Sequence, residues 1–316
     1  MQTGIATRWI TALAIVLTAC QTVDKQDFAD PFVLVEPAHF YAYGTNARGA
    51  NVQLRRANTL NDWQALPDAL PSLPAWASRR PGLVWAPEVM KIASRYLLYF
   101  TARDKASDRQ CIGVAEAAMP EGPFAARGSA PLVCQAAQGG TIDASPFRDE
   151  DGRLYLYFKN DGNCCGLPTW LYAQTLSADG LRVEGQAVPL LRNTQRWEGA
   201  VVEAPFMVRR DGRYVLFYSG NDYAGPPYAL GYANCSGPQG PCVVAPENPI
   251  LKSDLKATPP LIGPGHNAVF RVGGQDWIAY HAWEVRPDGR QGSQRLLHID
   301  KLDWIDGRPV VRGHRP

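Results

Sequence analysis

The sequence predicts an all-β protein that folds as a single-domain, five-bladed β-propeller. Three observations lead to this prediction: an aromatic content of 10%, a total of 29 glycines and 26 prolines among 316 residues, and a motif that recurs five times. Tyr, Trp and Phe favour strands, whereas frequent Gly and Pro interrupt long helices. The hydrophobic content of 46% is enough for a packed core, so a disordered chain and a helical bundle are both excluded.

The repeated motif starts with a small or acidic residue, continues with an apolar residue and a turn, and leads into an alternating aromatic strand. Anchors taken at Pro31, Pro87, Pro146, Pro205 and Asn267 are 56, 59, 59 and 62 residues apart. A unit of about 58 residues with turn signals such as Asp-Gly holds about four antiparallel strands, which is one propeller blade. Residues 28–316 are therefore predicted to form five blades.

The N-terminal segment predicts export. Arg8 precedes an apolar run that ends in Leu17-Thr18-Ala19-Cys20. This string resembles the bacterial lipobox, which implies a signal peptide over 1–19, a lipidated Cys20 and a tether over 20–27. We expect an exported, membrane-anchored bacterial lipoprotein at the outer membrane or the periplasmic face, with the Cys20 lipid as its only membrane contact. The alternative is a plain signal peptide with an incidental cysteine.

The other cysteines number six, and an even count in an exported protein suggests disulfides. Proximity favours pairing Cys235 with Cys242 and Cys111 with Cys134. Cys164 and Cys165 are then left as a vicinal disulfide or as two free thiols. The formal net charge of +2 supplies no basic field, so nucleic acid is not an expected partner. We expect a monomer.

Three acidic residues occur near the starts of different repeats: Asp30, Asp143 and Glu203. The innermost strand of each propeller blade lines the central channel, so circular closure is expected to bring these carboxylates together at one mouth. Carboxylates that face one another repel, and at least one pKa is expected to rise until that group stays protonated at neutral pH. A protonated carboxyl is the form that a general acid requires.

The chain resembles glycoside hydrolase family 43 in a series of strings that run in order from residue 30 to residue 309. These strings are Asp30-Pro31, Tyr43-Gly44-Thr45, Trp85-Ala86-Pro87-Glu88, Ile142-Asp143, Asp151-Gly152, Val202-Glu203-Ala204-Pro205, Phe217-Tyr218-Ser219, Gly263-Pro264-Gly265-His266-Asn267, Arg295 and Trp304-Ile305-Asp306-Gly307-Arg308-Pro309. The resemblance implies a five-bladed propeller enzyme that acts on arabinose- or xylose-containing oligosaccharides and polysaccharides.

By resemblance, Asp30 corresponds to the general base that activates water, and Glu203 to the general acid that protonates the leaving oxygen. Asp143 corresponds to the third carboxylate, which tunes the pKa of the acid and orients it. An inverting glycosidase needs an acid and a base about 6.5–9.5 Å apart, which agrees with this assignment. The chemistry requires no cofactor. Each carboxylate taken alone also suits a structural cap or turn.

The resemblance further implies a channel histidine at His266, which would bind substrate or hold a calcium or other cation, directly or through water. It also implies an active-site arginine at Arg295, with Arg290 as a nearby alternative. Trp85 is expected either to stack on a sugar or to pack between blades. Asn160 and Asn221, just past the central strands of blades three and four, are further candidates for substrate binding.

We expect an inverting glycoside hydrolase of plant cell-wall polysaccharides, first of all an exo-acting α-L-arabinofuranosidase. The last motif lies close to the end of the sequence, so we expect no appended β-sandwich such as many xylosidases of the family carry. A β-xylosidase or an endo-α-1,5-arabinanase is the alternative within the family. The alternative from another class is a non-catalytic carbohydrate-binding propeller, which would have no need for three repelling carboxylates.

Overall fold

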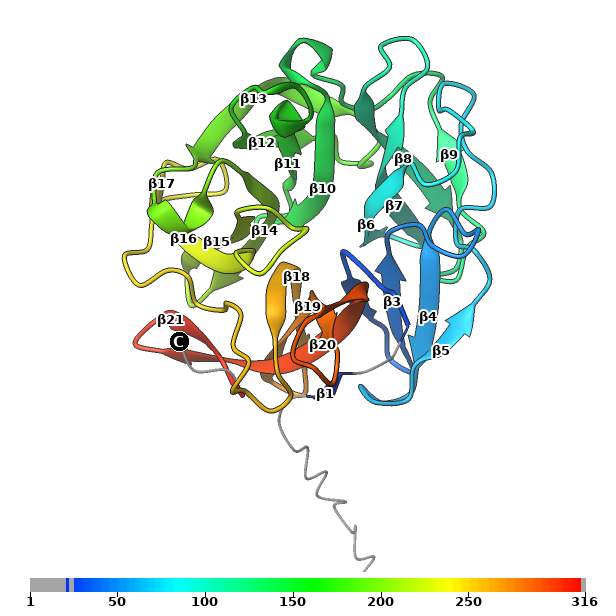
Figure 1. Ribbon diagram of the computed structural model, residues 1–316. Coiled ribbons are helices and arrows are strands. Elements are labelled where there is room, and N and C mark those ends of the chain that lie inside the picture. Colours follow the sequence, from blue (N-terminus) through cyan, green and yellow to red (C-terminus); the bar gives the residue numbers. More distant parts are fainter. Residues whose placement is uncertain (1–20, 23–25, 314–316) are drawn as a thin grey trace, which may run out of the picture.

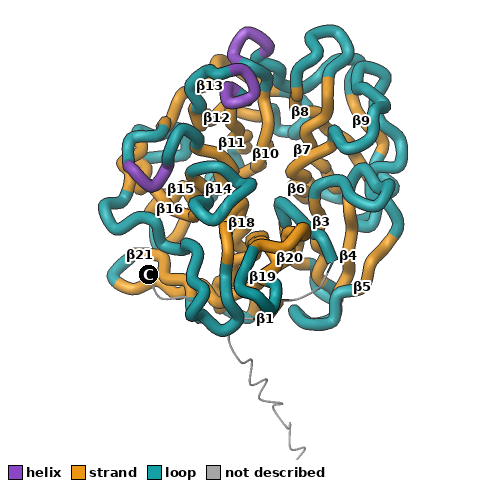
Figure 2. The backbone as a smooth tube through the Cα atoms, in the orientation of Figure 1, coloured by secondary structure: helices purple, strands orange, loops and turns teal. Residues whose placement is uncertain are grey.

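Residues 21–22 and 26–313 are described by the computed structural model, and they form five antiparallel sheets arranged radially around a common axis (Figure 1). The tube view shows that strands and connecting loops account for nearly all of the described backbone (Figure 2). The predicted five-bladed, all-β architecture is therefore confirmed. The predicted signal peptide over 1–19 and the predicted lipidation site Cys20 lie outside the described residues.

The first four blades each contain four strands in sequence order, counted from the axis outward. Blade one contains β2 (Phe32–Val35), β3 (Phe40–Gly44), β4 (Gln53–Ala57) and β5 (Gln64–Leu66). Blade two contains β6 (Val84–Ile92), β7 (Arg95–Arg103), β8 (Gln110–Ala117) and β9 (Ala125–Arg127).

Blades three and four follow the same order with longer outer strands in blade three. Blade three contains β10 (Thr141–Arg148), β11 (Leu154–Asn160), β12 (Trp170–Leu176) and β13 (Val183–Arg192). Blade four contains β14 (Val202–Arg210), β15 (Arg213–Gly220), β16 (Ala229–Cys235) and β17 (Cys242–Val244).

The fifth blade joins the two ends of the chain. It contains β18 (Ile262–Val272), β19 (Gln275–Val285) and the long β20 (Gln291–Ile305), whose outer edge pairs with both β21 (Arg308–Val311) and β1 (Gln21–Thr22). Gln21 lies opposite Ile299, so the beginning of the predicted tether is a strand of this blade. This pairing fixes residues 21–22 to the last blade.

Apolar side chains pack between every pair of neighbouring blades. In the cluster between blades three and four, for example, Tyr157 and Leu171 meet Leu216 and Tyr218, and all four are buried. Equivalent clusters fill the other four interfaces, including the one between blades five and one. Burial of these aromatic and aliphatic side chains stabilises the ring, and it accounts for most of the aromatic content.

A residue with a left-handed backbone occupies the same place near the start of the innermost strand in every blade, and we call this place the bulge. The residues have φ between 44° and 58°, and they are Asp30, which lies just before β2, Ala86, Asp143, Ala204 and His266. In blades two to five the register between the first two strands shifts at this residue. A non-glycine residue with positive φ is uncommon and stores strain, which functional sites often do.

The bulges correct two details of the sequence alignment. The residue that follows the bulge is Pro31, Pro87, Pro205 or Asn267 in four blades, but in blade three it is Ala144 and not Pro146. Glu203 lies one residue before the bulge of its blade, whereas Asp30 and Asp143 lie on theirs. The three carboxylates thus come from two adjacent positions of the repeat and not from one.

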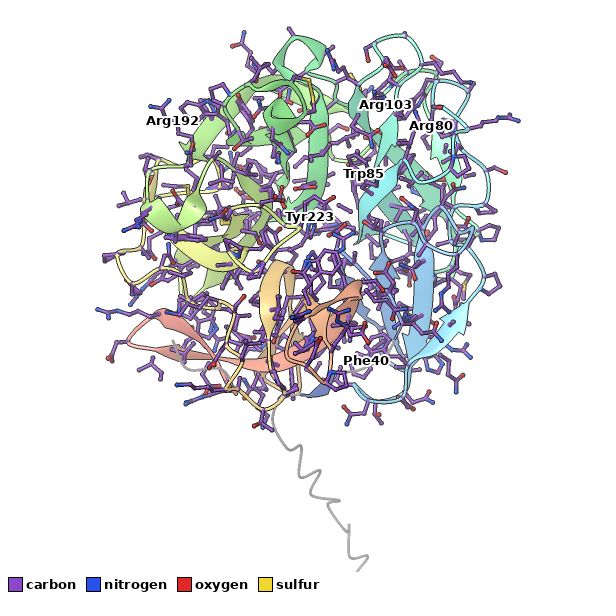
Figure 3. The ribbon with its side chains drawn as sticks, in the orientation of Figure 1. Phe40, Arg80, Trp85, Arg103, Arg192 and Tyr223 are labelled. Atoms are coloured by element: carbon purple, nitrogen blue, oxygen red, sulfur yellow. A yellow bond between two sulfur atoms is a disulfide. The ribbon has the colours of Figure 1, made fainter. Side chains whose placement is uncertain are left out.

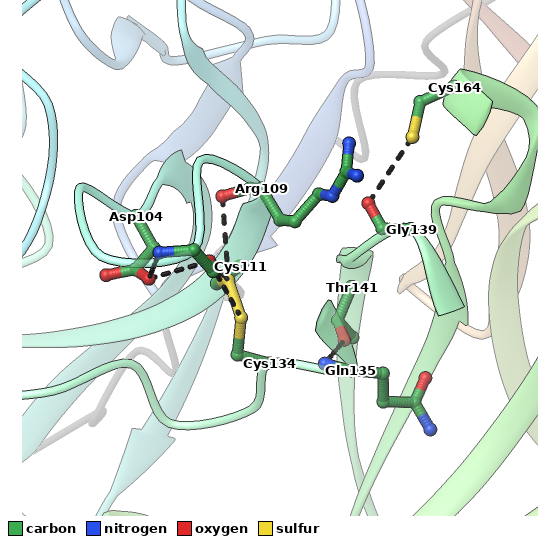
Figure 4. The surroundings of a disulfide bond; sticks show 9 residues. Asp104, Arg109, Cys111, Cys134, Gln135, Gly139, Thr141 and Cys164 are labelled. Atoms are coloured by element: carbon green, nitrogen blue, oxygen red, sulfur yellow. Dashed lines mark hydrogen bonds between the residues drawn. A yellow bond between two sulfur atoms is a disulfide. The ribbon is translucent and has the colours of Figure 1, made fainter. Parts of the chain in front are cut away.

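Three disulfides join the six cysteines within their loops and blades: Cys111 with Cys134, Cys164 with Cys165, and Cys235 with Cys242. Figure 4 shows the first of them with the neighbouring Cys164 of the vicinal pair. The described helices are three short 3-10 turns at Ala136–Gln138, Gly162–Cys165 and Arg196–Glu198. Within the described ranges, no helix has the length and apolar character needed to cross a membrane.

Candidate active site

The candidate site lies at one end of the ring, where the innermost strands begin and the second strands end. Thr141 at the start of β10 pairs with Asn160 at the end of β11, and the corresponding ends of the other blades lie on the same face. The loops that follow the second strands therefore surround the residues near the bulges. Loops carried by a rigid scaffold in this way are common places for catalytic groups.

Asp30 is bound by residues from blades one and five. Its Oδ1 lies 3.3 Å from Arg295 Nη1 and 3.4 Å from His266 Nδ1, and its Oδ2 accepts a hydrogen bond from the Thr45 hydroxyl. Burial alone would raise the pKa of Asp30, but the positive charge of Arg295, together with His266, outweighs burial and holds this pKa well below its ordinary value. Asp30 is consequently a carboxylate throughout the working pH range.

His281 fixes the backbone of Asp30. The backbone N–H of Asp30 donates to His281 Nδ1 at 3.1 Å, and the His281 side chain is fully buried on β19. Burial and the nearby charge of Arg295 lower the pKa of His281 to about 4, so the ring is neutral and its Nδ1 is free to accept. The bulge that carries the predicted base is thus held by the preceding blade in the ring.

Glu203 is bound by two donors. Lys159 Nζ lies 3.0 Å from Oε2, and the Tyr228 hydroxyl donates to Oε1 at 2.7 Å. Burial would raise the pKa of Glu203, but Lys159 and then Tyr228 favour the carboxylate, and the net direction is downward. In the free protein the environment of Glu203 therefore stabilises its ionised form, which is the form that a general acid reaches after it has given up its proton.

Gly265 makes room for the tyrosine that binds Glu203. A Cβ at this position would lie 2.1 Å from Tyr228 Cε1, far inside van der Waals contact. Gly265 occupies in blade five the place, just before the bulge, that Glu203 occupies in blade four. The close approach of Tyr228 therefore requires a glycine at the second glycine position of the Gly-Pro-Gly-His string.

Asp143 carries the raised pKa that the sequence predicts for one carboxyl of the group. Burial is the main cause, the negative charge of Glu203 adds to it, and together they raise the pKa of Asp143 to about 6 against the opposing charges of His266 and Lys159. Asp143 Oδ2 also accepts the backbone N–H of Ala204 at 2.9 Å. Asp143 and Glu203 are neighbours, and the proton of the pair resides on Asp143 in the free protein.

His266 lies between the two groups of acidic residues. It faces Asp30 Oδ1, and its charge acts on both Asp143 and Glu203. Among the described residues, three ligand atoms of His, Cys, Asp or Glu come within metal-binding distance of one another only at Asp104, Cys111 and Cys134, where the two sulfurs are joined in a disulfide. The cation expected near His266 therefore stays a prediction, and His266 acts in the site through its contact with Asp30.

Of the two candidate arginines, Arg295 reaches the site and Arg290 does not. Arg290 pairs at 3.9 Å with Asp288 on the surface. Trp85 lies just before the bulge of blade two, the place that Glu203 holds in blade four, and its indole N–H donates to the Gly82 carbonyl at 3.0 Å. Figure 3 labels Trp85 and Tyr223 near the centre of the ring.

The two candidate asparagines are occupied by backbone groups of their own and neighbouring loops. Asn160 Nδ2 donates to the carbonyls of Gln138 and Pro168, and its Oδ1 accepts from the N–H of Trp170. Asn221 Nδ2 donates to the Trp197 carbonyl, and its Oδ1 accepts from the N–H of Asp222. These contacts place both side chains as supports of the loops around the site.

Sequence reasoning did not single out Lys159, Tyr228, His281 or Tyr223. Lys159 lies next to the end of an alternating aromatic strand, where a polar residue ordinarily faces solvent, yet it has no exposed surface. A signal for it was present: the pairing of β10 with β11 sets Lys159 opposite Ile142, next to the bulge at Asp143. Residues opposite a bulge that carries a candidate catalytic group point to the same site.

The family profile "Glycosyl hydrolases family 43" matches residues 21–309. The chain is 29% identical to the β-D-galactofuranosidase xynD of Aspergillus niger, over 90% of this chain and 82% of that protein. It is 23% identical to the extracellular exo-α-(1→5)-L-arabinofuranosidase ArbA of Cellvibrio japonicus, over 94% and 91% of the two chains.

A solved structure, described as a thermostable family-43 glycoside hydrolase, superposes with a TM-score of 0.82 at 31% identity, over 92% of this chain and 94% of that one. An endo-1,4-β-xylanase from Bacteroides thetaiotaomicron superposes with a TM-score of 0.77 at 28% identity, over 92% and 95%. Profile, sequence and fold agree over the same region, so the chain belongs to glycosyl hydrolase family 43 and hydrolyses glycosidic bonds.

Proposed function

We propose that the protein is an exo-acting, inverting α-L-arabinofuranosidase in which Asp30 is the base and Glu203 the acid. The observation that carries this proposal is that the site favours opposite charge states at two places: the ionised form at Asp30 and the protonated form at Asp143. Arg295 and His266 keep Asp30 ionised, while Asp143, which acts on Glu203 in the same buried site, holds a proton up to about pH 6. A base without a proton and a proton held near the acid are what a single displacement by water requires.

The reaction proceeds in one displacement. Asp30 accepts a proton from water as the water oxygen forms a bond to the anomeric carbon of the terminal sugar. The bond from that carbon to the glycosidic oxygen breaks, its electron pair goes to the leaving oxygen, and Glu203 supplies the proton that this oxygen takes up. Release of a proton by Asp30 to solvent and uptake of one by Glu203 then restore the enzyme.

Asp143 acts on the acid in two ways. Its hydrogen bond from the N–H of Ala204 fixes the backbone next to Glu203. Its proton, held below about pH 6, is adjacent to the Glu203 carboxylate and can pass to it when the leaving oxygen approaches. The pair therefore supplies one proton in slightly acidic solution and none well above pH 6.

Exo action is supported by the loop between β15 and β16, which blade five holds over Arg295. Trp283 Nε1 donates to the Tyr223 carbonyl at 2.8 Å, and Gln291 Nε2 donates to the Ala224 carbonyl at 2.9 Å. The Arg295 guanidinium lies 5.1 Å from the centre of the Tyr223 ring. A loop fastened beside the base favours access of a chain end over a chain interior to Asp30, which supports exo action.

A β-D-galactofuranosidase is the second candidate, because xynD of Aspergillus niger carries that description. The furanose rings of α-L-arabinose and β-D-galactose have the same configuration and differ in the substituent at C4. A site built around the ring therefore accepts either sugar unless the exocyclic group is excluded. A β-xylosidase and an endo-arabinanase are the remaining alternatives within the family.

Hydrolysis of 4-nitrophenyl α-L-arabinofuranoside, β-D-galactofuranoside and β-D-xylopyranoside ranks these activities directly. We expect the arabinofuranoside to be cleaved fastest, and arabinan to release arabinose alone from the first minutes. Early oligosaccharides would reject exo action, and a faster rate on either other glycoside would replace the sugar assignment. Proton NMR of the first product should show inversion at the anomeric carbon; retained configuration would reject the single displacement.

We also propose export and anchoring through Cys20, on the strength of Leu17-Thr18-Ala19-Cys20. Labelled palmitate should be incorporated into the wild-type chain in a bacterial host and not into Cys20→Ser. Equal labelling of both chains would reject the lipid anchor.

A further inference from the structure

A ring of equivalent side chains faces the bulges from the second strand of each blade. In blades two to five, each of these residues pairs across the first two strands with the residue just before the bulge. In blade one, the backbone N–H of Thr45 donates to the carbonyl of Ala29, the residue just before Asp30, and this bond gives Thr45 the equivalent place. The five residues are Thr45, Thr101, Lys159, Ser219 and His281. The lysine of blade three is the cationic exception among hydroxyl and imidazole groups.

Three members of this ring accept the backbone N–H of the bulge in the next blade. Thr45 Oγ1 accepts from Ala86 at 2.9 Å, Ser219 Oγ accepts from His266 at 2.8 Å, and His281 Nδ1 accepts from Asp30 at 3.1 Å. An ammonium group has no lone pair, so Lys159 cannot do the same for Ala204. Asp143 accepts that N–H in its place. The fold thus compensates for a lysine where it ordinarily uses an acceptor.

Lys159 uses its donors inside the site. Its Nζ lies 3.0 Å from Glu203 Oε2 and 2.8 Å from Asn163 Oδ1, and the residue has no exposed surface. A buried charge is costly unless it is paired and hydrogen-bonded, and a buried ion pair adds little net stability over a well-packed apolar pair. The pair as a whole is therefore not explained by stability, whereas the contact of the ammonium with Glu203 gives the lysine a role at the acid.

The other ionisable groups around this pair come from every neighbouring element. Asp143 lies on β10, His266 on β18 and Tyr228 just before β16, and each acts on Glu203 or its partner. Asp161, in the loop after β11, feels the charges of Lys159, Asp143 and Glu203. Lys159 is the group of this set that puts a full positive charge in contact with a Glu203 oxygen.

We propose that Lys159 is a positioning residue for the general acid: its ammonium holds Glu203 Oε2 in place and stabilises the carboxylate left when Glu203 has protonated the leaving oxygen. The inference rests on the acid role proposed above for Glu203. Asn163 fixes the ammonium from the side of the loop after β11. The effect is greatest for poor leaving groups, because their oxygen needs the most complete proton transfer.

The test compares wild type with Lys159→Met, which is neutral and of similar length, and with Lys159→Arg, which keeps the charge. Carbon NMR of glutamate-labelled protein follows the titration of Glu203, assigned with Glu203→Gln. Removal of a contacting opposite charge should raise the Glu203 titration midpoint by about one to three pH units in Lys159→Met, and Lys159→Arg should stay near wild type. Lys159→Gln is a second neutral variant should the methionine variant fail to fold.

Kinetics supply the readout in the reaction. At pH values where Glu203 is protonated in both proteins, kcat of Lys159→Met should fall roughly 3- to 30-fold on a methyl furanoside and change little on the 4-nitrophenyl furanoside. An unmoved Glu203 titration in a folded neutral variant, or equal losses on both substrates, overturns the proposal. Inactivity of the wild type on all furanosides and xylosides rejects the proposed function instead, and the NMR titration still decides whether Lys159 controls the charge of Glu203.

Discussion

Asp143 Oδ2 accepts the backbone N–H of Ala204 at 2.9 Å, so one carboxyl group of the site anchors the residue next to another. Asp143→Ala leaves this buried N–H without a partner, whereas Asp143→Asn keeps an acceptor. At pH 5, where Asp143 is protonated, we expect Asp143→Ala to lower the free energy of unfolding by about 1–3 kcal/mol more than Asp143→Asn. Urea denaturation measures the difference, and equal losses would show that the bond does not hold the bulge.

The raised pKa of Asp143 predicts how stability depends on pH. Between the ordinary aspartate value of 3.8 and the folded value of about 6, the folded protein holds a proton that the unfolded chain has lost. Stability relative to Asp143→Asn therefore falls as the pH rises through this window and levels off above it. The full change is on the order of 3 kcal/mol. If the difference in unfolding free energy between the two proteins stayed constant from pH 4 to pH 7, Asp143 would not hold a proton in the folded protein that it loses on unfolding.

The same groups predict the pH dependence of catalysis. Asp30 stays ionised to well below pH 3.8, and the proton of the Asp143–Glu203 pair is lost near pH 6. We expect kcat/KM on an arabinofuranoside to be highest in slightly acidic solution and to decline above about pH 6. Asp143→Asn removes one titrating carboxyl and should move this alkaline limb. A limb that stays in place would assign the decline to another group.

Leaving-group dependence separates the acid from the base. Glu203→Gln cannot donate a proton, so kcat should fall roughly 10²–10⁴-fold on a methyl furanoside and much less on the 4-nitrophenyl furanoside. Asp30→Asn should impair both substrates to a similar degree, because water must be activated in each case. If Glu203→Gln affected both substrates equally, the acid role would belong elsewhere.

The sequence was sufficient to predict the five blades, because each blade repeats the same turn signals and aromatic alternation. It also indicated that distant carboxylates such as Asp30 and Glu203 converge, since a closed ring brings equivalent positions together. The charge state of each carboxyl could not be predicted. That state depends on Lys159 and Arg295, which lie on other strands and touch the carboxylates only through strand register and loop geometry.

The sequence also did not predict which residue of each repeat occupies the bulge. Pro146 resembles the proline anchors of the other repeats, but the strand pairing sets Ala144 at the equivalent place. Proline is compatible with either offset, because both avoid the need for a backbone N–H in the ladder. Only the hydrogen-bond register distinguishes the two, and one or two residues of offset decide which side chain faces the site.

Tyr223 gives the last prediction, because it joins the loop of blade four to the arginine that pairs with the base. Its side chain is 47% exposed, its ring lies 5.1 Å from the Arg295 guanidinium, and Arg295 lies 3.3 Å from Asp30. Cation–π contacts at an exposed ring contribute about 0.5–1 kcal/mol, so kcat/KM of Tyr223→Ala should fall roughly 2- to 5-fold. Most of the loss should appear in KM, since the exposed ring face is free to contact the sugar. Tyr223→Phe keeps the ring and should stay near wild type; a loss as large in the phenylalanine variant would mean that the hydroxyl, and not the aromatic face, carries the contact.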